Sequence, residues 1–310
     1  PHKVKIGQIQ EIRQCISCNI GCAGHRIGLN RPIRCTVNPD VFYDDAYKKH
    51  SDATAIINTT PCGMYPNIGA SAIDLSRFEN VKSVTDAVYN PLSSALVISA
   101  RERGINATGG LYMLVSQAAY AVEKFTGGSI SADKTEEVYR EILNDKKNIV
   151  LIGMPGCGKT TIGKILADEL NKDFTDTDDE IIKRINMPIA DYFAKHGEES
   201  FRRVESEVIK EISACQSSVI ATGGGAFLNP DNIRLLKENG TVIFIDRPLE
   251  KLVTTADRPL SSSREQLEKR YKERYGLYCA AADIKIDAVS RIEQNVKNIE
   301  EVFLNENSCN

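Results

Sequence analysis

The chain has 310 residues, of which 42% are hydrophobic and 26% charged, and its 39 basic against 42 acidic residues give a net charge of −3. This length fits about two domains of ordinary size, and the near balance of charge gives no reason to expect nucleic acid or an anionic membrane as a partner. No apolar run approaches the roughly 18 residues that a membrane-spanning helix needs. The first residues, PHKVKIGQIQ, lack an initiator Met and an apolar export signal. We therefore expect a cytoplasmic protein that is a processed chain or a piece of a longer reading frame.

Residues 1–42 are rich in Cys, Gly and Pro and show little helical periodicity, which predicts an irregular loop. Cys15, Cys18, Cys22 and Cys35 follow the spacing C-x2-C-x3-C-x12-C. Three close thiolates and a distant fourth can hold a 4Fe–4S cluster, whereas a four-thiolate zinc site usually has two C-x2-C pairs. An empty remnant of such a site is the third interpretation. The odd total of nine cysteines, most of the others scattered, does not indicate a disulfide framework.

The stretch CISCNIGCAGHR, followed by IRCTVNP, resembles the cluster-binding segment of the iron–sulfur flavin reductases related to old yellow enzyme and dienoyl-CoA reductase. The resemblance implies that the four cysteines are cluster ligands. It covers this segment alone, because the flavin-binding barrel of those proteins has no counterpart in the sequence.

Residues 43–127 alternate strand and helix patterns. Strands are predicted at 54–58 (TAIIN) and 83–88 (SVTDAV), and helices at 93–104 and 110–125, the second closed by TGG.

In this segment INTTPCGMYPN, AVYNP and GINATGGLYMLVSQAAYAVEKFTG resemble the last part of shikimate dehydrogenase. The resemblance implies a partial Rossmann-like domain with Tyr89 and Gln117 on the substrate side. The family's substrate domain and Gly-rich cofactor fingerprint have no counterpart here. We therefore expect no dehydrogenase activity from this chain.

Residues 128–147 are polar and predict a linker with one amphipathic helix, after which a second α/β pattern occupies residues 148–310. Helical stretches separate its apolar strands, which favours a parallel sheet. We predict an α/β fold of three layers, with a central parallel sheet between helices. The strands are expected at 148–153, 218–224, 241–246 and 283–287.

The second pattern opens with GMPGCGKT at 153–160, which fits the phosphate-binding loop (P-loop) signature G-x-x-x-x-G-K-[ST] between an apolar strand and a helix. Glycines let backbone N–H groups close around phosphate oxygens, and the helix N-terminus adds partial positive charge. Lys159 is predicted to bridge the β- and γ-phosphates and Thr160 to contact Mg²⁺. A Gly-rich turn with a chance Lys is the alternative. The predicted nucleotide-binding residues are Gly156, Cys157, Gly158, Lys159, Thr160 and Thr161.

Two acidic residues follow the next short strand. Asp176 and Asp178 are two apart, so on an extended chain they would share one face. One carboxylate could then hold a water of Mg²⁺ and the other a substrate hydroxyl. The alternative is an acidic N-cap turn before the helix EIIKRI.

Further along, ATGGGAF at 221–227 puts three glycines after a strand, which suggests a backbone that a ligand approaches closely. ADRPL at 256–260 offers an Arg in a short connection, and RYGLY at 274–278 offers another after a long basic helix.

The set DTD, GEESFRR, GGGA, DRPL and RYGLY follows the P-loop in the order and approximate spacing of shikimate kinase, which residues 148–305 resemble. The resemblance implies a P-loop kinase that transfers the γ-phosphoryl group of ATP to the 3-hydroxyl of shikimate, with Mg²⁺ as cofactor, in the biosynthesis of aromatic amino acids. Positioning and electrostatics would provide most of the catalysis. We expect a monomeric kinase domain.

The resemblance also gives individual residues a role. Asp178 would orient the shikimate hydroxyls and take the proton of the attacking one. Arg202 and Arg274 would bind the carboxylate, for which the planar guanidinium is well suited. Glu205, one helical turn after Arg202, would hold that guanidinium. Gly223, Gly224 and Gly225 would contact the substrate, with Gly224 donating an N–H, and Phe193 and Phe201 would form a pocket wall or ordinary core packing. Asp176 would contact Mg²⁺ through water. Lys159 and Arg258 would neutralise the transferring phosphoryl group.

Two other function classes stay open. One is an iron–sulfur redox protein related to shikimate dehydrogenase with an ATP-binding appendage. The other is a P-loop kinase for another small acceptor, such as gluconate or a nucleotide, although Arg202, Arg274 and the three glycines favour a carboxylate-bearing polyol. The stretch LVTTADRPL lacks the Arg that stacks on adenine in many shikimate kinases. Arg291 is a candidate for that contact, and a solvated surface Arg is the favoured alternative for it.

Overall fold

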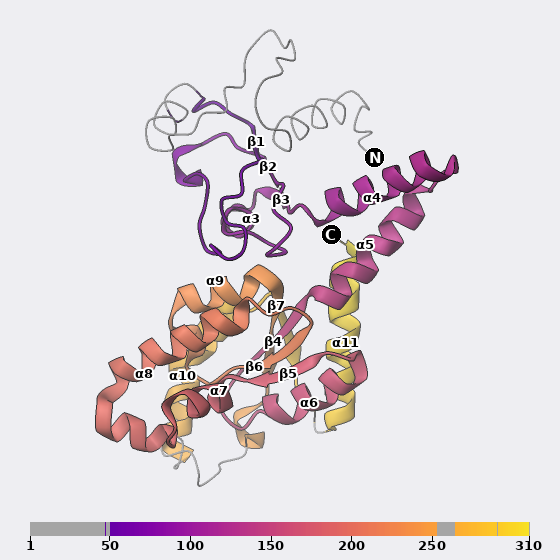
Figure 1. Cartoon of the computed structure of the whole chain (residues 1–310). Helices are drawn as coiled ribbons and strands as arrows, with labels where there is room; N and C mark the ends of the chain where they lie inside the picture. Colours follow the sequence, from indigo (N-terminus) through magenta and orange to yellow (C-terminus); the bar gives the residue numbers. More distant parts are fainter. Residues whose placement is uncertain (1–46, 48–49, 253–263, 290, 310) are drawn as a thin grey trace.

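The computed structural model describes residues 47, 50–252, 264–289 and 291–309, and it consists of two α/β units joined by a pair of helices (Figure 1). Cys15, Cys18, Cys22 and Cys35 lie outside the described residues. In the described part, no helix is long and apolar enough to cross a membrane.

The first unit is a small parallel sheet of three strands in the order β1-β2-β3. Helix α3 packs against β2 and β3, and Ser94 caps its N-terminus through a hydrogen bond from the Val97 N–H. Its buried core is thin: Leu75, Phe78, Val81, Val84, Leu96 and Ala100. The elements are β1 (Ala55–Asn58), η1 (Leu75–Arg77), β2 (Ser83–Asp86), α3 (Ala95–Glu102) and β3 (Asn106–Thr108).

Helices α4 (Leu111–Thr126) and α5 (Ala132–Lys146) form the connecting pair. Helix α4 ends at Gly127, whose φ of 70° is in the left-handed region that glycine adopts without strain, as the TGG signal predicts. The C-terminal end of α5 is tied to the second unit by Lys172, whose ammonium donates to the carbonyl oxygens of Asn144 and Asp145 at 2.7 Å each.

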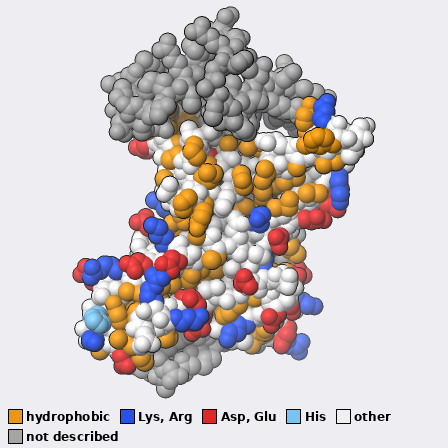
Figure 2. Space-filling model, viewed as in Figure 1, with side chains coloured by type: hydrophobic (Ala, Val, Ile, Leu, Met, Phe, Trp, Pro, Cys, Tyr) orange, Lys and Arg blue, Asp and Glu red, His pale blue; other side chains and the backbone are white. Residues whose placement is uncertain are grey.

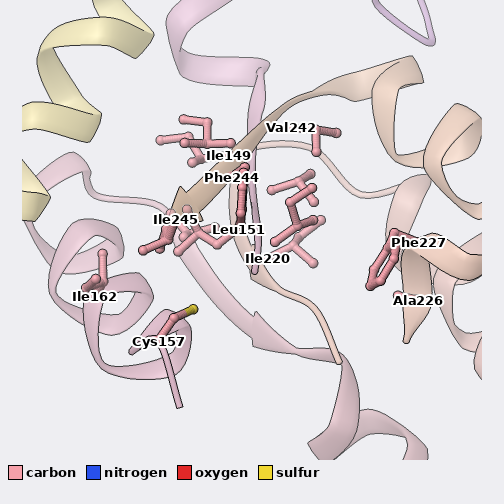
Figure 3. Close-up of a cluster of buried hydrophobic side chains, with 14 of the residues drawn as sticks. Ile149, Leu151, Cys157, Ile162, Ile220, Ala226, Phe227, Val242, Phe244 and Ile245 are labelled. Carbon is pink, nitrogen blue, oxygen red and sulfur yellow. The ribbon is translucent and has the colours of Figure 1, made fainter. Parts of the chain in front are cut away.

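The second unit contains a parallel sheet of five strands in the order β5-β6-β4-β7-β8. Strands β4, β6 and β7 are buried along their whole length, which explains their continuous apolar sequences. Figure 3 shows the aliphatic and aromatic side chains that they place in the core, among them Ile149, Ile220 and Phe244. The strands are β4 (Asn148–Ile152), β5 (Asp173–Asp176), β6 (Ser218–Ala221), β7 (Gly240–Asp246) and β8 (Ile284–Asp287).

Helices cover both faces of this sheet, which confirms the predicted three-layer fold. Helices α6 and α11 lie on one side, and α8, α9 and α10 lie on the other (Figure 1). The helical elements are α6 (Lys159–Leu170), α7 (Thr177–Ile185), α8 (Ile189–Ser213), η2 (Ala226–Leu228), α9 (Pro230–Asn239), η3 (Leu249–Lys251), α10 (Arg264–Ala281) and α11 (Ile292–Cys309).

The two units meet where α3 packs on α9. The Leu92 N–H donates to Oδ1 of Asn239 at 3.0 Å, and the Ser93 N–H donates to the Glu238 carbonyl at 2.8 Å. At the rim, Glu102 pairs with Arg234 at 3.1 Å. The first unit thus rests on the helix that follows the Gly223–Gly225 loop.

Candidate active site

The site residues meet because β4, β5 and β6 are neighbours in a parallel sheet. Their carboxyl ends lie at one edge, where ligands of open α/β sheets bind. The P-loop follows β4, the Asp176–Asp178 turn follows β5, and the three glycines follow β6.

The P-loop leads into α6 through Gly158, whose φ of 101° is in the left-handed region. Lys159, Thr160 and Thr161 form the first turn of that helix, where backbone N–H groups lack helical partners. Lys159 is buried, and its ammonium donates to the carbonyl oxygens of Gly153 at 2.9 Å and Met154 at 3.2 Å.

Cys157 contributes to this loop through its backbone. Its side chain is completely buried and belongs to the core cluster, near Ile162 of α6 (Figure 3). A Cβ on Gly153 would lie 2.9 Å from the Cys157 sulfur and 2.8 Å from the Ile245 carbonyl oxygen, so the loop packs too tightly for a side chain at position 153.

Asp176 joins the P-loop to β5. Its Oδ2 accepts a hydrogen bond of 2.8 Å from the Thr160 hydroxyl, and its Oδ1 accepts one of 3.0 Å from the Asp178 N–H. The prediction that Asp176 and Asp178 share one face of an extended chain is therefore wrong. Asp176 ends β5 and caps α7, while Asp178 lies in the first turn of that helix. The N-cap alternative is correct, and the cap still leaves a carboxylate beside a P-loop hydroxyl.

The donor set at this point fits Mg²⁺. A hydroxyl and a carboxylate side by side are oxygen ligands, which Mg²⁺ prefers over nitrogen or sulfur. Among the described residues no group of three or more His, Cys, Asp or Glu side chains is placed to hold a metal ion.

The glycine loop lies where three parts of the site converge. The Gly223 N–H donates to the buried Thr177 hydroxyl at 2.7 Å. A Cβ on Gly223 would collide with Oδ1 of Asp178, and one on Gly225 would collide with the Arg202 guanidinium. A Cβ on Gly224 would lie 3.1 Å from Pro155 of the P-loop. These positions are glycine because Asp178, Arg202 and the P-loop occupy the space beside the loop.

Arg202, on α8, is held by two carboxylates. Its Nη1 donates to Glu205 at 2.7 Å and its Nη2 donates to Glu198 at 3.2 Å. Glu205 is only 2% exposed, and burial raises the pKa of Glu205 although the neighbouring Arg202 opposes that shift. The predicted contact between Glu205 and Arg202 is therefore present.

Arg274 comes from the opposite side of the loop. Its Nη1 donates to the Gly224 carbonyl at 2.6 Å. The prediction that Arg274 follows a long basic helix is wrong, because Arg274 lies inside α10. The continuous helix points Arg274 and Tyr278, one turn later, at the same carbonyl.

Of the two predicted wall residues, Phe201 lies beside Arg202 and Phe193 stacks on Phe201. Phe193 and Phe201 stack with their ring centroids 4.4 Å apart, and the Arg202 guanidinium lies 5.4 Å from the Phe201 ring. Phe201 also belongs to the core cluster, so packing and lining the site are compatible for it.

Four other predicted residues remain. Arg258 lies outside the described residues, so its predicted role stays a prediction. Tyr89 and Gln117 are exposed, on the first unit and on α4, and Arg291 is exposed just before α11. Sequence reasoning missed Thr177 and Tyr278, although both stand inside motifs that it quoted.

Comparison with known proteins assigns the second unit to a family. A family model described as shikimate kinase matches residues 155–303. A shikimate kinase from Clostridium botulinum strain Eklund 17B is 44% identical over 164 residues, which are 52% of this chain and 99% of that protein. The chain belongs to the shikimate kinase family. The structure titled shikimate kinase from Acinetobacter baumannii in complex with shikimate matches at 31% identity and a TM-score of 0.51, over 54% of this chain and 98% of its own.

A structure titled chorismate mutase/shikimate 5-dehydrogenase fusion protein from Clostridium acetobutylicum matches at 34% identity, over 34% of this chain and 43% of its own. Its TM-score is 0.30, and we base no assignment on it.

The shikimate kinase site is distinct from a cavity of about 580 Å³ beside α4 and α5. Hydrophobic side chains gather over these helices (Figure 2), and aliphatic residues such as Leu111, Val115 and Ile142 line the cavity. Neither the P-loop nor the Gly223–Gly225 loop contributes to its lining.

Proposed function

We propose that residues 148–310 form a kinase domain that transfers the γ-phosphoryl group of ATP to the 3-hydroxyl of shikimate. The observation that carries the proposal is the convergence of Arg202, Arg274 and Asp178 on the Gly223–Gly225 loop, which packs against the P-loop. Two guanidiniums suit a carboxylate, and the aspartate suits a hydroxyl. An acceptor that carries both groups fits this wall beside the ATP phosphates.

On the ATP side, backbone N–H groups of the P-loop and the start of α6 would surround the phosphates. The buried Lys159 ammonium already lies over the loop, where it would exchange its carbonyl partners for β- and γ-phosphate oxygens. Thr160 and Asp176 would hold Mg²⁺, directly or through water. When bound, that ion supplies positive charge that neutralises the phosphate oxygens.

On the acceptor side, Arg202 and Arg274 would bind the shikimate carboxylate, and Glu205 would keep Arg202 in place. The 3-hydroxyl oxygen would then form a bond to the γ-phosphorus as the bond to the β,γ-bridging oxygen breaks. Asp178 would accept the hydroxyl proton. From the sequence, Arg258 would help Lys159 to neutralise the transferring group.

The alternative with a specific rationale is a P-loop kinase of another small acceptor. A coupled assay of ADP release with shikimate, gluconate and a nucleoside monophosphate separates the two. We expect turnover with shikimate alone at micromolar to millimolar concentrations, about the usual range of enzyme KM values. Turnover with another acceptor and none with shikimate would refute the proposal.

For the rest of the chain, we propose a cytoplasmic fusion: a Cys-rich segment (1–42), a dehydrogenase-like partial domain without activity (43–127), a linker (128–147) and a monomeric kinase domain. The support is the sequence resemblance described above. An iron–sulfur cluster on the four cysteines stays a prediction. It is tested by an anaerobic visible spectrum, which should show a broad band near roughly 400 nm if thiolates ligate iron. Its absence after anaerobic reconstitution would refute the cluster.

A further inference from the structure

Tyr278 places a buried hydroxyl on the loop that would bind the acceptor. Its side chain is completely buried on α10, and its hydroxyl donates to the Gly224 carbonyl at 3.1 Å. The ring stacks on Phe244 with centroids 5.2 Å apart, and it contacts Phe227 at 4.0 Å. Burial raises the pKa of Tyr278, so the phenol stays protonated and remains a donor.

The Gly224 carbonyl accepts from two side chains, since Arg274 donates to it at 2.6 Å. Under the proposed function, Arg274 must direct its donors to the acceptor's carboxylate. Leaving a partly buried peptide carbonyl without a hydrogen-bond donor costs free energy. If Arg274 were its only donor, that cost would weaken binding of the acceptor. Tyr278 is placed to keep this carbonyl hydrogen-bonded while Arg274 engages the acceptor.

The same hydrogen bond fixes the loop relative to the P-loop. Gly224 packs so closely on Pro155 that a Cβ would lie 3.1 Å from that ring. The Gly223 N–H, on the other side of the loop, is held by Thr177. A shift of the Gly224 peptide would therefore move the acceptor wall relative to the ATP site.

We propose that Tyr278 is a positioning residue for the acceptor, whose hydroxyl holds the Gly224 carbonyl and so leaves Arg274 free to bind the acceptor's carboxylate. This inference deepens the proposed function and rests on it. Tyr278 touches neither ATP nor the reacting atoms in this account. It acts through the loop and through Arg274.

The test is Tyr278→Phe, which removes the hydroxyl and keeps the stacked ring. We expect the KM for shikimate to rise about tenfold, the value of one ordinary hydrogen bond in a buried site. The kcat and the KM for ATP should stay within about twofold, because the P-loop contacts do not involve this hydroxyl. Tyr275→Phe is the matched control. It lies on the same helix, but its hydroxyl donates to Asp246 at 2.9 Å, and it should leave the KM for shikimate unchanged.

Two further measurements separate positioning from a merely structural role. In an Arg274→Gln background, Tyr278→Phe should change the KM for shikimate less than about twofold, because the guanidinium that it frees is gone. With an acceptor whose carboxylate is replaced by a neutral carboxamide, wild type and Tyr278→Phe should have the same KM.

An unchanged KM for shikimate in Tyr278→Phe overturns the inference. The inference is also overturned if Tyr278→Phe raises the KM for the carboxamide, or the KM for shikimate in the Arg274→Gln background, as much as it raises the KM for shikimate in the wild-type background. In each of these cases wild-type turnover of shikimate leaves the proposed function intact. Absence of wild-type turnover overturns the proposed function and this inference together. Circular dichroism of Tyr278→Phe at the assay temperature verifies that the loss is not unfolding.

Discussion

Glu238 provides a pH-dependent test of how the two units are joined. It is the second-last residue of α9, it is 2% exposed, and its carbonyl accepts from the Ser93 N–H of the first unit. Its Oε2 has no hydrogen-bond donor in the described part of the chain. Burial raises the pKa of Glu238 from 4.5 to about 7, although a hydrogen bond from the Gly69 N–H opposes the shift.

The direction in which stability changes with pH follows from whether the folded or the unfolded chain holds the proton. Below about pH 4.5 the carboxyl group is protonated in the folded and the unfolded chain alike. Between there and about pH 7 the unfolded chain loses the proton while the folded chain retains it, so the free energy of unfolding falls as the pH rises. A difference of about 2.5 pKa units corresponds to about 3 kcal/mol, all of it lost above pH 7.

The perturbation is Glu238→Gln, which keeps the shape and the acceptor for Gly69 but stays neutral. Because the chain has no Trp, urea unfolding is best followed by far-UV circular dichroism, at pH 5, 6, 7 and 8. The variant should be about as stable as wild type near pH 5 and about 2–3 kcal/mol more stable at pH 8. The exposed control Glu301→Gln should shift stability by less than about 0.5 kcal/mol at every pH. An offset for Glu238→Gln that does not depend on pH would refute the reasoning.

Two further predictions concern the catalytic site. Asp178→Asn should lower kcat by at least about 100-fold, the usual contribution of a positioned acid or base, while the Kd for ATP in a direct titration stays unchanged. A near-normal rate would remove Asp178 from the acceptor role. Gly225→Ala should raise the KM for shikimate by roughly tenfold or more and leave the KM for ATP unchanged, because its Cβ displaces the Arg202 guanidinium. Equal effects on the two substrates would indicate general disruption instead.

The sequence predicts most of the second unit because its signals are local. The runs NIVLI, SVIA and TVIFID form strands that are buried along their whole length, and such runs need no partner to be recognised. The signature at 153–160 predicts the loop and the helix after it for the same reason. In the first unit, β3 escapes prediction, since its three residues, Asn106–Thr108, show no apolar alternation.

The site geometry is less predictable, because it depends on where strands end and on tertiary contacts. Asp176 and Asp178 have the residue types that the chemistry needs, but the strand ends at Asp176 and a helix begins, which changes their relation. Thr177 and Tyr278 leave no pattern in the sequence. Each is a single buried hydroxyl that bonds to the backbone of a glycine distant in the chain, and only the fold brings them together.

The central claim is that the P-loop, Asp178 and the two arginines serve one reaction. It is tested most directly by identifying the product. The protein is incubated with ATP, Mg²⁺ and shikimate, and the mixture is analysed by ³¹P and ¹H NMR. We expect equal amounts of ADP and of shikimate that carries one phosphoryl group on its 3-hydroxyl. Release of ADP with inorganic phosphate and unmodified shikimate, or a phosphoryl group at another hydroxyl, would contradict the account.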